Sequence, residues 1–174
     1  MLKNGDLLFV RAYNNQFEKM IADSTSQYHN YTHVGIFIDD NVIHANPKNG
    51  CVKQPLDEFI NAQKAPINIF RIMNKQINLN FIKKRAESMI GLPYNHSFLQ
   101  TDRGLYCSEL ITETFKDYHI FQLKPLNFGS NRQIKYWKKY YEKLGLSLPK
   151  NELGSSPNSL LDNNQLRFIQ KIKK

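Results

Sequence analysis

Strand-like segments come first and helix-like segments come later in this 174-residue sequence. Up to residue 72, short apolar runs mostly alternate with polar turns, a pattern that is typical of buried strands. Beyond residue 72, apolar residues recur with the 3.6-residue period of helices. Parallel sheets need strands and helices that alternate, so this order favours an α+β fold over an α/β fold.

The expected strands are short, and the expected helices follow clear apolar faces. We expect strands at 7–10, 33–38, 42–45, from residue 51 onward, and at 67–72. We expect a short helix around residues 17–21 and longer ones at 79–90, 106–118 and 134–144. The longest face comprises Cys107, Leu110, Ile111, Thr114, Phe115 and Tyr118. Residues 147–164 are rich in Ser, Asn, Pro and Gly, which predicts an extended loop before a short terminal element.

The length and the apolar content are those of one folded domain. A chain of 174 residues, 41% of them apolar, can bury roughly 70% of its unfolded surface. We expect a single domain over residues 1–174, with residues 147–174 as an extended C-terminal segment packed on it. No apolar run reaches the ~18 residues of a transmembrane helix, and no signal-peptide pattern is present. The sequence as given predicts a cytoplasmic protein, or one of the cell envelope or periplasm if a signal peptide has been removed.

The formal net charge of +9 is concentrated near the C-terminus. Residues 1–130 carry 14 basic and 12 acidic residues, whereas residues 131–174 carry 10 basic and 3 acidic residues. The basic, aromatic stretch 135–141 could bind nucleic acid or anionic lipid, because aromatic rings stack on bases and lysines neutralise phosphates. However, Trp137, Tyr141 and Leu144 fall on one helical face, which favours a buried stripe with the lysines in solvent. We therefore expect no nucleic acid as a partner, and peripheral association with a membrane or the cell wall stays open.

Cys107 is the residue with the clearest chemical potential. It stands at the predicted start of a helix, where free backbone N–H groups and the helix dipole favour the thiolate form of cysteine. The same N–H groups could donate hydrogen bonds to a developing oxyanion. The alternative is an inert core cysteine, because Cys107 shares a helical face with Leu110 and Ile111. Cys51 follows a turn at a strand start and fits a structural thiol better.

A nucleophilic cysteine needs a base, and two histidines lie on neighbouring predicted strands. His33 begins one strand and His44 ends the next. In any hairpin register whose paired residue numbers add to an odd number, both rings project from the same face, where Gly35 leaves room. A two-residue loop at Asp40–Asn41 would keep the rings about four positions apart. A slipped register or a longer loop would place them side by side, where one could act as a base and the other could orient it.

Metal binding is the competing use of the same histidines. Neither a His-Glu-x-x-His motif nor a Cys-x-x-Cys motif is present, and the chain has only two cysteines. We therefore expect no metal site and no cofactor.

Five short motifs together resemble a known enzyme family. They are, in order, Gly5-Asp6-Leu7-Leu8-Phe9, Thr32-His33-Val34-Gly35-Ile36, Val42-Ile43-His44-Ala45, Gly91-Leu92-Pro93-Tyr94 and Tyr106-Cys107-Ser108-Glu109-Leu110. This set resembles the YiiX/YebB-like proteins, which are circularly permuted papain-fold enzymes related to the NlpC-type cell-wall amidases. The diagnostic point is that His33 precedes Cys107, whereas the nucleophile precedes the histidine in the unpermuted relatives.

The resemblance implies a fold and a set of roles. The fold is an α+β, permuted papain-like (NlpC-type) fold, a curved antiparallel sheet or small barrel packed against helices, with the nucleophile at a helix N-terminus. Cys107 would be the nucleophile, His33 the general base and His44 the third member of the triad, a position where relatives often have Glu. Tyr106 and Tyr94 would contribute near the substrate or the oxyanion.

The activity implied by the resemblance is that of a cysteine hydrolase of the amidase or peptidase type. It would act through a Cys-His-His thiolate mechanism with an acyl-enzyme intermediate, on cell-wall peptides or small acyl amides. The alternative is an acyltransferase or another lipid-directed thiol enzyme, because permuted relatives such as lecithin retinol acyltransferase transfer acyl groups between lipids. A basic module that binds nucleic acid or anionic lipid is the remaining, non-enzymatic alternative.

Overall fold

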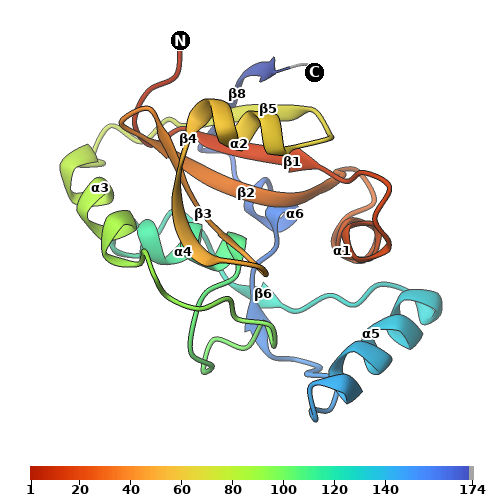
Figure 1. Ribbon diagram of the computed structural model, residues 1–174. Coiled ribbons are helices and arrows are strands. Elements are labelled where there is room, and N and C mark those ends of the chain that lie inside the picture. The colour runs from red at the N-terminus through yellow and green to blue at the C-terminus, as the bar shows by residue number, and fades with distance from the viewer. Residues whose placement is uncertain (173–174) are drawn as a thin grey trace.

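Six antiparallel strands form one sheet at the centre of the protein (Figure 1). In this computed structural model, which describes residues 1–172, the strands stand in the order β4-β3-β2-β1-β5-β8. Every neighbouring pair is antiparallel, and the sheet is curved and open, not closed into a barrel. The bounds are β1 Leu7–Arg11, β2 Tyr31–Ile38, β3 Asn41–Asn46, β4 Gly50–Pro55, β5 Ile67–Ile72 and β8 Leu166–Ile172.

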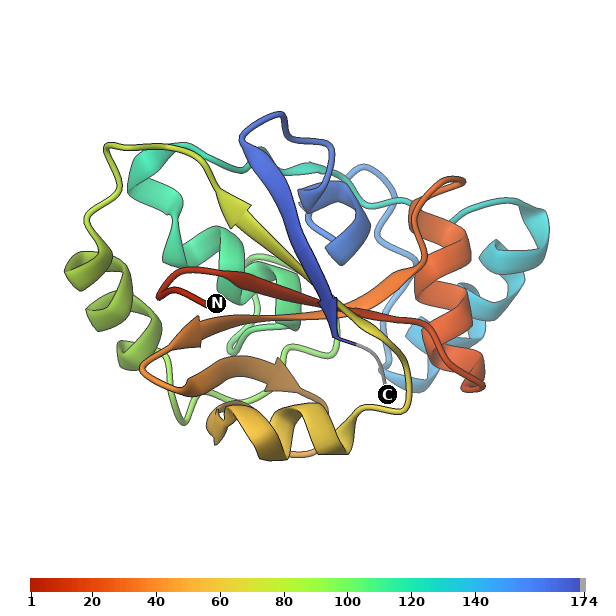
Figure 2. The ribbon, with the colours of Figure 1, turned by 90° about the horizontal axis from the view of Figure 1, so that it is seen from above.

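Helices cover both faces of this sheet. Helix α2 lies on one face, and α3, α4 and α6 lie on the other, whereas α5 packs against α1 (Figure 2). A second, two-stranded sheet pairs β6 (Lys124–Pro125) with β7 (Leu153–Gly154). The helical bounds are α1 Gln16–Thr25, α2 Leu56–Ala62, α3 Leu79–Ser88, α4 Cys107–Thr114, the 3-10 turn η1 Lys116–Tyr118, α5 Asn131–Lys143 and α6 Pro157–Leu160.

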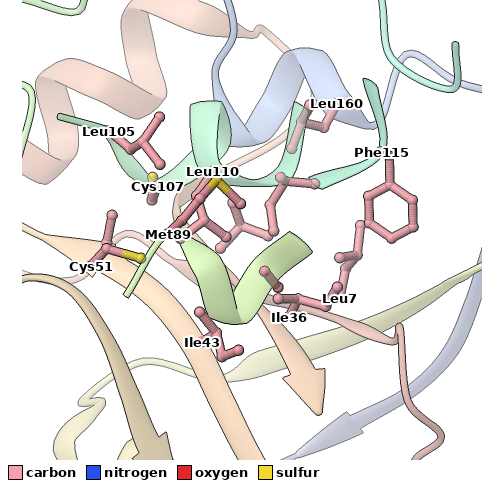
Figure 3. Close-up of a cluster of buried hydrophobic side chains, with 14 of the residues drawn as sticks. Leu7, Ile36, Ile43, Cys51, Met89, Leu105, Cys107, Leu110, Phe115 and Leu160 are labelled. Carbon is pink, nitrogen blue, oxygen red and sulfur yellow. The ribbon is translucent and has the colours of Figure 1, made fainter. Parts of the chain in front are cut away.

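Alternate residues of β2 contribute to two separate cores. The larger core receives side chains from α3, α4 and α6, and it contains both Cys107 of α4 and Cys51 of β4 (Figure 3). The smaller core joins Phe37 of β2 to Phe59 of α2. Successive strand residues alternate between faces, so His33 shares the face of Phe37. The β2 residues of the larger core are Val34, Ile36 and Ile38, together with Tyr31, which lies beyond the irregularity in the β1–β2 register that precedes His33.

The α+β fold and its antiparallel sheet confirm the sequence prediction, and the differences lie in short elements. The apolar face predicts a helix up to Tyr118, but α4 ends at Thr114. The chain continues there as η1, and His119 then adopts a left-handed conformation with φ 50°, which stops the helix. Helix α6 begins at Pro157 inside the segment expected to be an extended loop. The terminal element is an edge strand, β8, that pairs with β5.

Helix α5 buries part of its aromatic face as predicted. Trp137 and Tyr141 are buried against Met20 of α1, and the indole N–H of Trp137 donates a hydrogen bond of 2.8 Å to the hydroxyl of Ser24. These two rings are therefore not free to stack on bases. Leu144 is exposed because it lies at the C-cap, after the last helical residue, so its predicted place in the buried stripe is wrong.

The C-terminal charge lies only partly within the described chain. The last two lysines of the basic tail, Lys173 and Lys174, lie outside the described residues. Within residues 1–172, no helix combines the length and the apolar character that crossing a membrane requires.

Candidate active site

The β2–β3 hairpin sets the register of the two histidines. Its turn is Asp39–Asp40, whose φ angles of 45° and 58° are those of the type I′ turn that suits a two-residue hairpin. Phe37 then pairs with Val42. Of the two registers that the sequence leaves open, the structure therefore has the slipped one, shifted by one residue from a loop at Asp40–Asn41, because the left-handed conformation falls on the two aspartates. The resulting register brings the histidine rings together.

His33 of β2 and His44 of β3 are in direct contact. Nε2 of His33 lies 2.9 Å from Nδ1 of His44, with the ring planes at 83°. Gly35 makes room for this contact, because a Cβ there would lie 2.5 Å from the side chain of Val42 and 3.1 Å from the Cβ of His44. Phe59 packs against both rings, with centroid distances of 6.1 and 5.0 Å. The pair is therefore held from two sides.

Desolvation favours the neutral form of both imidazoles, His44 being buried and His33 partly buried. Desolvation lowers the pKa of His33 well below its usual 6.5, and charge on His44 would lower it further. Desolvation also lowers the pKa of His44, although a hydrogen bond of 3.1 Å between its Nε2 and the side-chain oxygen of Gln54 opposes this change. A neutral imidazole carries one unprotonated nitrogen, so His33 is in a form that can accept a proton at neutral pH.

Cys107 begins α4 with its sulfur against the N-terminal half of β2. Sγ lies 4.0 Å from the carbonyl oxygen of Thr32. The backbone N–H groups of Val34, Ser108 and Cys107 itself donate toward the sulfur. Strand β3 pairs with β2 only near the hairpin turn, so the edge of β2 farther from the turn is open to the helix start. The divergence of the two strands therefore places the thiol beside the strand that bears His33.

Burial controls the ionisation of this thiol. It raises the pKa of Cys107 from 9.0 to about 11, although the three backbone N–H groups act in the opposite direction. The prediction that the helix start favours the thiolate is therefore wrong for the free enzyme. Cys107 is only 6% exposed, and a low-dielectric surrounding disfavours a charged sulfur more than the N–H groups favour it. Cys51 is affected in the same way, with its pKa raised to about 12.

Two cavities meet at Cys107. The larger one, about 660 Å³, is lined by His33, His44 and many polar side chains, among them Glu18 of α1. The smaller one, about 210 Å³, is mainly apolar. Thr32, Tyr94 and Cys107 line both cavities. The aromatic residues of the smaller cavity are Tyr94, Phe98, Tyr106, Phe128, Trp137 and Tyr141.

The two tyrosines expected near the substrate differ in their surroundings. Tyr94 lines both cavities, and burial raises the pKa of its hydroxyl. The hydroxyl of Tyr106 accepts hydrogen bonds from the backbone N–H of Ser155 at 3.0 Å and from the side-chain amide of Gln100 at 3.1 Å. Tyr106 thus joins the start of α4 to the segment after β7, and it forms part of the wall of the smaller cavity.

Gln54 and Phe59 are parts of the site that the sequence motifs do not indicate. Gln54 lies in β4, and Phe59 lies in α2, which follows β4 directly. Strand β4 pairs with β3 in a register that places Gln54 opposite Val42. Gln54 could have been predicted from the turn at Asn46–Gly50, because a tight hairpin there places His44 and Gln54 on the same face of the sheet. Phe59 belongs to α2, a helix too short for its period to stand out.

The family of the chain follows from its sequence match. A model of the permuted papain-like amidase enzymes, YaeF/YiiX, C92 family, matches residues 1–170. The chain belongs to this family. As a member of Peptidase_C92 it is a cysteine hydrolase of the papain-like amidase kind, as the resemblance of the five motifs implies. No curated protein sequence matches the chain significantly.

A solved structure shows the same fold as this C92 member. The crystal structure of YiiX from Escherichia coli O157:H7 is similar with a TM-score of 0.82, over 98% of this chain and 97% of that chain, at 22% sequence identity. At this identity the likeness establishes the fold alone. The permuted papain-like fold expected from the sequence is thereby confirmed.

YiiX is described as a metalloprotein, which raises the question of a metal in this family member. Among residues 1–172, no three His, Cys, Asp or Glu side chains are grouped so that they could hold a metal ion. Zinc sites in proteins have at least three such ligands. The residues of the described chain do not fit a metal centre, and we assign no step of the reaction to one.

Proposed function

We propose that this enzyme hydrolyses an amide bond, with Cys107 as the nucleophile, His33 as the general base and His44 as the residue that orients His33. The observation that carries the proposal is the 2.9 Å contact of the two histidines in a cavity that Cys107 also lines. A thiol, an imidazole and a group that holds the imidazole are the parts that nucleophilic catalysis by cysteine requires.

The reaction proceeds in two halves. The thiol of Cys107 gives its proton to His33 while the sulfur attacks the carbonyl carbon, and the carbonyl oxygen takes up the negative charge. The N–H groups of Cys107 and Ser108, which point toward the sulfur, donate to this oxyanion. The C–N bond then breaks, the amine leaves with the proton from His33, and a thioester remains. A water molecule, deprotonated by His33, attacks the thioester and releases the acid.

The resting state holds a neutral thiol and a neutral imidazole. Burial raises the pKa of Cys107 to about 11 and lowers that of His33. Proton transfer therefore accompanies attack on a bound carbonyl instead of preceding it. In the free site no group can take up the negative charge, whereas the oxygen of a carbonyl bound at the helix start can do so. Exclusion of water from the cavity strengthens the hydrogen bonds that the N–H groups donate to this oxyanion.

The two cavities suggest how the substrate is oriented. The smaller, aromatic cavity of about 210 Å³ suits the acyl group, since an apolar cavity of about 150 Å³ already holds a benzene ring. The larger cavity of about 660 Å³ contains both histidines and polar side chains, so it suits the amine that leaves. A small acyl amide with an apolar acyl group therefore matches the site better than a polar cell-wall peptide.

Acyl transfer is the second candidate function. The larger cavity, about 660 Å³, has room for a group much larger than one water molecule. An amine or alcohol bound there could replace water in the second half of the reaction. The same thioester would then yield a new amide or ester.

The experiment compares hydrolysis of N-octanoyl-para-nitroanilide, N-acetyl-para-nitroanilide and an Ala-Glu dipeptide amide by the wild type, Cys107→Ser and Cys51→Ser. We expect the octanoyl anilide to be cleaved best, Cys107→Ser to be inactive, and Cys51→Ser to keep wild-type activity. Hydrolysis that survives in Cys107→Ser would contradict the proposal. Addition of glycinamide tests the second candidate, because a transferase then forms octanoyl-glycinamide at the expense of octanoic acid.

A further inference from the structure

Three side chains on neighbouring strands form one hydrogen-bonded row across the sheet. His33 of β2 contacts His44 of β3 at 2.9 Å, and His44 contacts Gln54 of β4 at 3.1 Å. The registers place all three on the face of the sheet that α2 covers, because Phe37 pairs with Val42 and Val42 pairs with Gln54. Each ring nitrogen of His44 therefore has its own partner.

The direction of these hydrogen bonds follows from the donors and acceptors present. The side-chain oxygen of Gln54 can only accept, so Nε2 of His44 carries a hydrogen. A neutral imidazole has one hydrogen, so Nδ1 of His44 is unprotonated and accepts from Nε2 of His33. Nδ1 of His33 is then the unprotonated nitrogen, and it makes no hydrogen bond within residues 1–172. With both rings neutral, the orientation of the Gln54 amide, whose oxygen faces His44, decides which tautomer each ring adopts.

We propose that Gln54 is a positioning residue that selects, through His44, the tautomer of His33 in which Nδ1 is free to take the proton of Cys107. The proposal rests on the proposed function for the base role of His33, but the tautomers themselves can be measured without any reaction. If the Gln54 amide were reversed, its NH₂ group would donate to Nε2 of His44. Every hydrogen in the row would then shift, and Nδ1 of His33 would be protonated and unable to act as a base.

Packing around the row favours this role over a simple structural one. Phe59 covers both rings on one side, and Gly35 leaves space for the side chain of His44. The two rings are thereby fixed in place by their neighbours. Gln54 itself is only partly buried, and within residues 1–172 the one hydrogen bond of its side chain is the one to His44. Loss of the Gln54 oxygen is therefore expected to change the protonation pattern of the row more than the fold.

The test is nitrogen-15 NMR of the histidine rings at neutral pH in Cys107→Ala, which reports tautomers in the absence of turnover. In this background we expect Nε2 of both His33 and His44 to be protonated and both Nδ1 atoms to be unprotonated. Gln54→Glu keeps an oxygen acceptor in either orientation and should keep this pattern. Gln54→Met, which has a similar length but no such acceptor, should give mixed tautomers at both rings. Gln170→Met, on the exposed edge strand β8, is the matched control.

Kinetics with active Cys107 supply the second readout. Gln54→Met should lower kcat by about 10- to 100-fold, the range for loss of an outer hydrogen-bond partner, with KM changed less than about twofold. Gln54→Glu should retain kcat near neutral pH, but its acid limb should move to higher pH, because a carboxylate favours the protonated imidazole. A merely structural role would not move the pH profile.

The outcomes separate this proposal from the proposed function. Wild-type tautomers in Gln54→Met, or a protonated Nδ1 on His33 in the Cys107→Ala parent, overturn the role of Gln54, whatever the activity. If NMR shows the expected tautomers but the wild type hydrolyses no amide, the role of Gln54 stands and the proposed function is overturned instead.

Discussion

The sulfur of Cys107 lies 4.0 Å from the carbonyl oxygen of Thr32, the residue immediately before His33. Thr32 and Cys107, 75 positions apart in sequence, thus meet at the end of β2 that does not pair with β3. The N–H of Val34, two residues further on, donates toward the same sulfur. One strand therefore supplies both the backbone that holds the thiol and the imidazole proposed to deprotonate it.

Alkylation of Cys107 should show the pH dependence of an unactivated thiol. Because burial raises the pKa of Cys107 to about 11, the thiolate fraction, and with it the rate of reaction with iodoacetamide, should rise about tenfold per pH unit between pH 7 and 10. The measurement is made by mass spectrometry in Cys51→Ser, which removes the other thiol. A rate that is already constant at pH 7 would show a thiolate in the free enzyme and contradict the resting state described here.

Gly35→Ala should damage activity through the histidine pair. A Cβ at this position would lie 2.5 Å from the side chain of Val42 and 3.1 Å from the Cβ of His44, so the Val42 side chain must shift and the β3 residues around His44 must give way. We expect a loss of about 1–3 kcal/mol in the free energy of unfolding, measured with urea. We also expect kcat to fall by a larger proportion than the free energy of unfolding does. Val42→Ala in the same chain removes the closest contact and should restore part of both. Full activity of Gly35→Ala alone would show that the contact between the histidines is not needed.

Glu109 should make the stability of the enzyme fall as the pH rises. Its carboxylate accepts hydrogen bonds from the backbone of Tyr106 and the side chain of Asn95, but burial raises its pKa from 4.5 to about 7. Between these values the folded state holds the proton more tightly than the unfolded state does. The free energy of unfolding therefore decreases as the pH passes from about 4.5 to about 7 and stays low above that range.

Glu109→Gln keeps an oxygen acceptor and removes the titration. The variant should gain stability relative to the wild type between pH 5 and pH 8, by on the order of 1–3 kcal/mol. Urea denaturation at the two pH values measures this difference. Glu142→Gln, at an exposed position on α5, serves as the control and should leave the wild-type trend in place. An unchanged trend in Glu109→Gln would refute the assignment to Glu109.

Leu126→Trp should change the preference for the acyl group. Leu126 lines the smaller cavity, so a larger side chain would occupy the space proposed for the acyl group. We expect kcat/KM for N-octanoyl-para-nitroanilide to fall at least about tenfold, the scale on which a hydrophobic pocket discriminates by size, with little change for the acetyl analogue. Leu123→Trp, at an exposed position nearby in sequence, should alter neither value. Equal losses for both substrates in Leu126→Trp would argue against an acyl site in this cavity.

The strands and most helices follow from the sequence because they depend on local apolar patterns. The register of the histidine hairpin did not, since Asp39, Asp40 and Asn41 are all acceptable turn residues and only the assembled sheet selects the first two. The five ordered motifs are sufficient to propose one site for Cys107, His33 and His44, because their order does not depend on the register.

The pKa of the Cys107 thiol is the property of the site that the sequence predicts least well. The start of a helix predicts a lowered thiol pKa for Cys107, but the surroundings that desolvate it come from β2 and from segments distant along the chain. Gln54 was missed for a similar reason. A glutamine on a strand has no chemical signature of its own, and its significance arises only from the hydrogen bond to His44.

The central claim is that Cys107 forms an acyl-enzyme with the assistance of His33, and intact mass spectrometry after rapid quenching tests it most directly. The enzyme is mixed with excess N-octanoyl-para-nitroanilide, and the adduct is located by peptide mapping, with Cys51 as the internal control. We predict one octanoyl group on Cys107, none on Cys51, and no adduct in His33→Asn. Octanoylation of Cys51 to the same extent, or an adduct on Cys107 that forms equally fast in His33→Asn, would contradict the account.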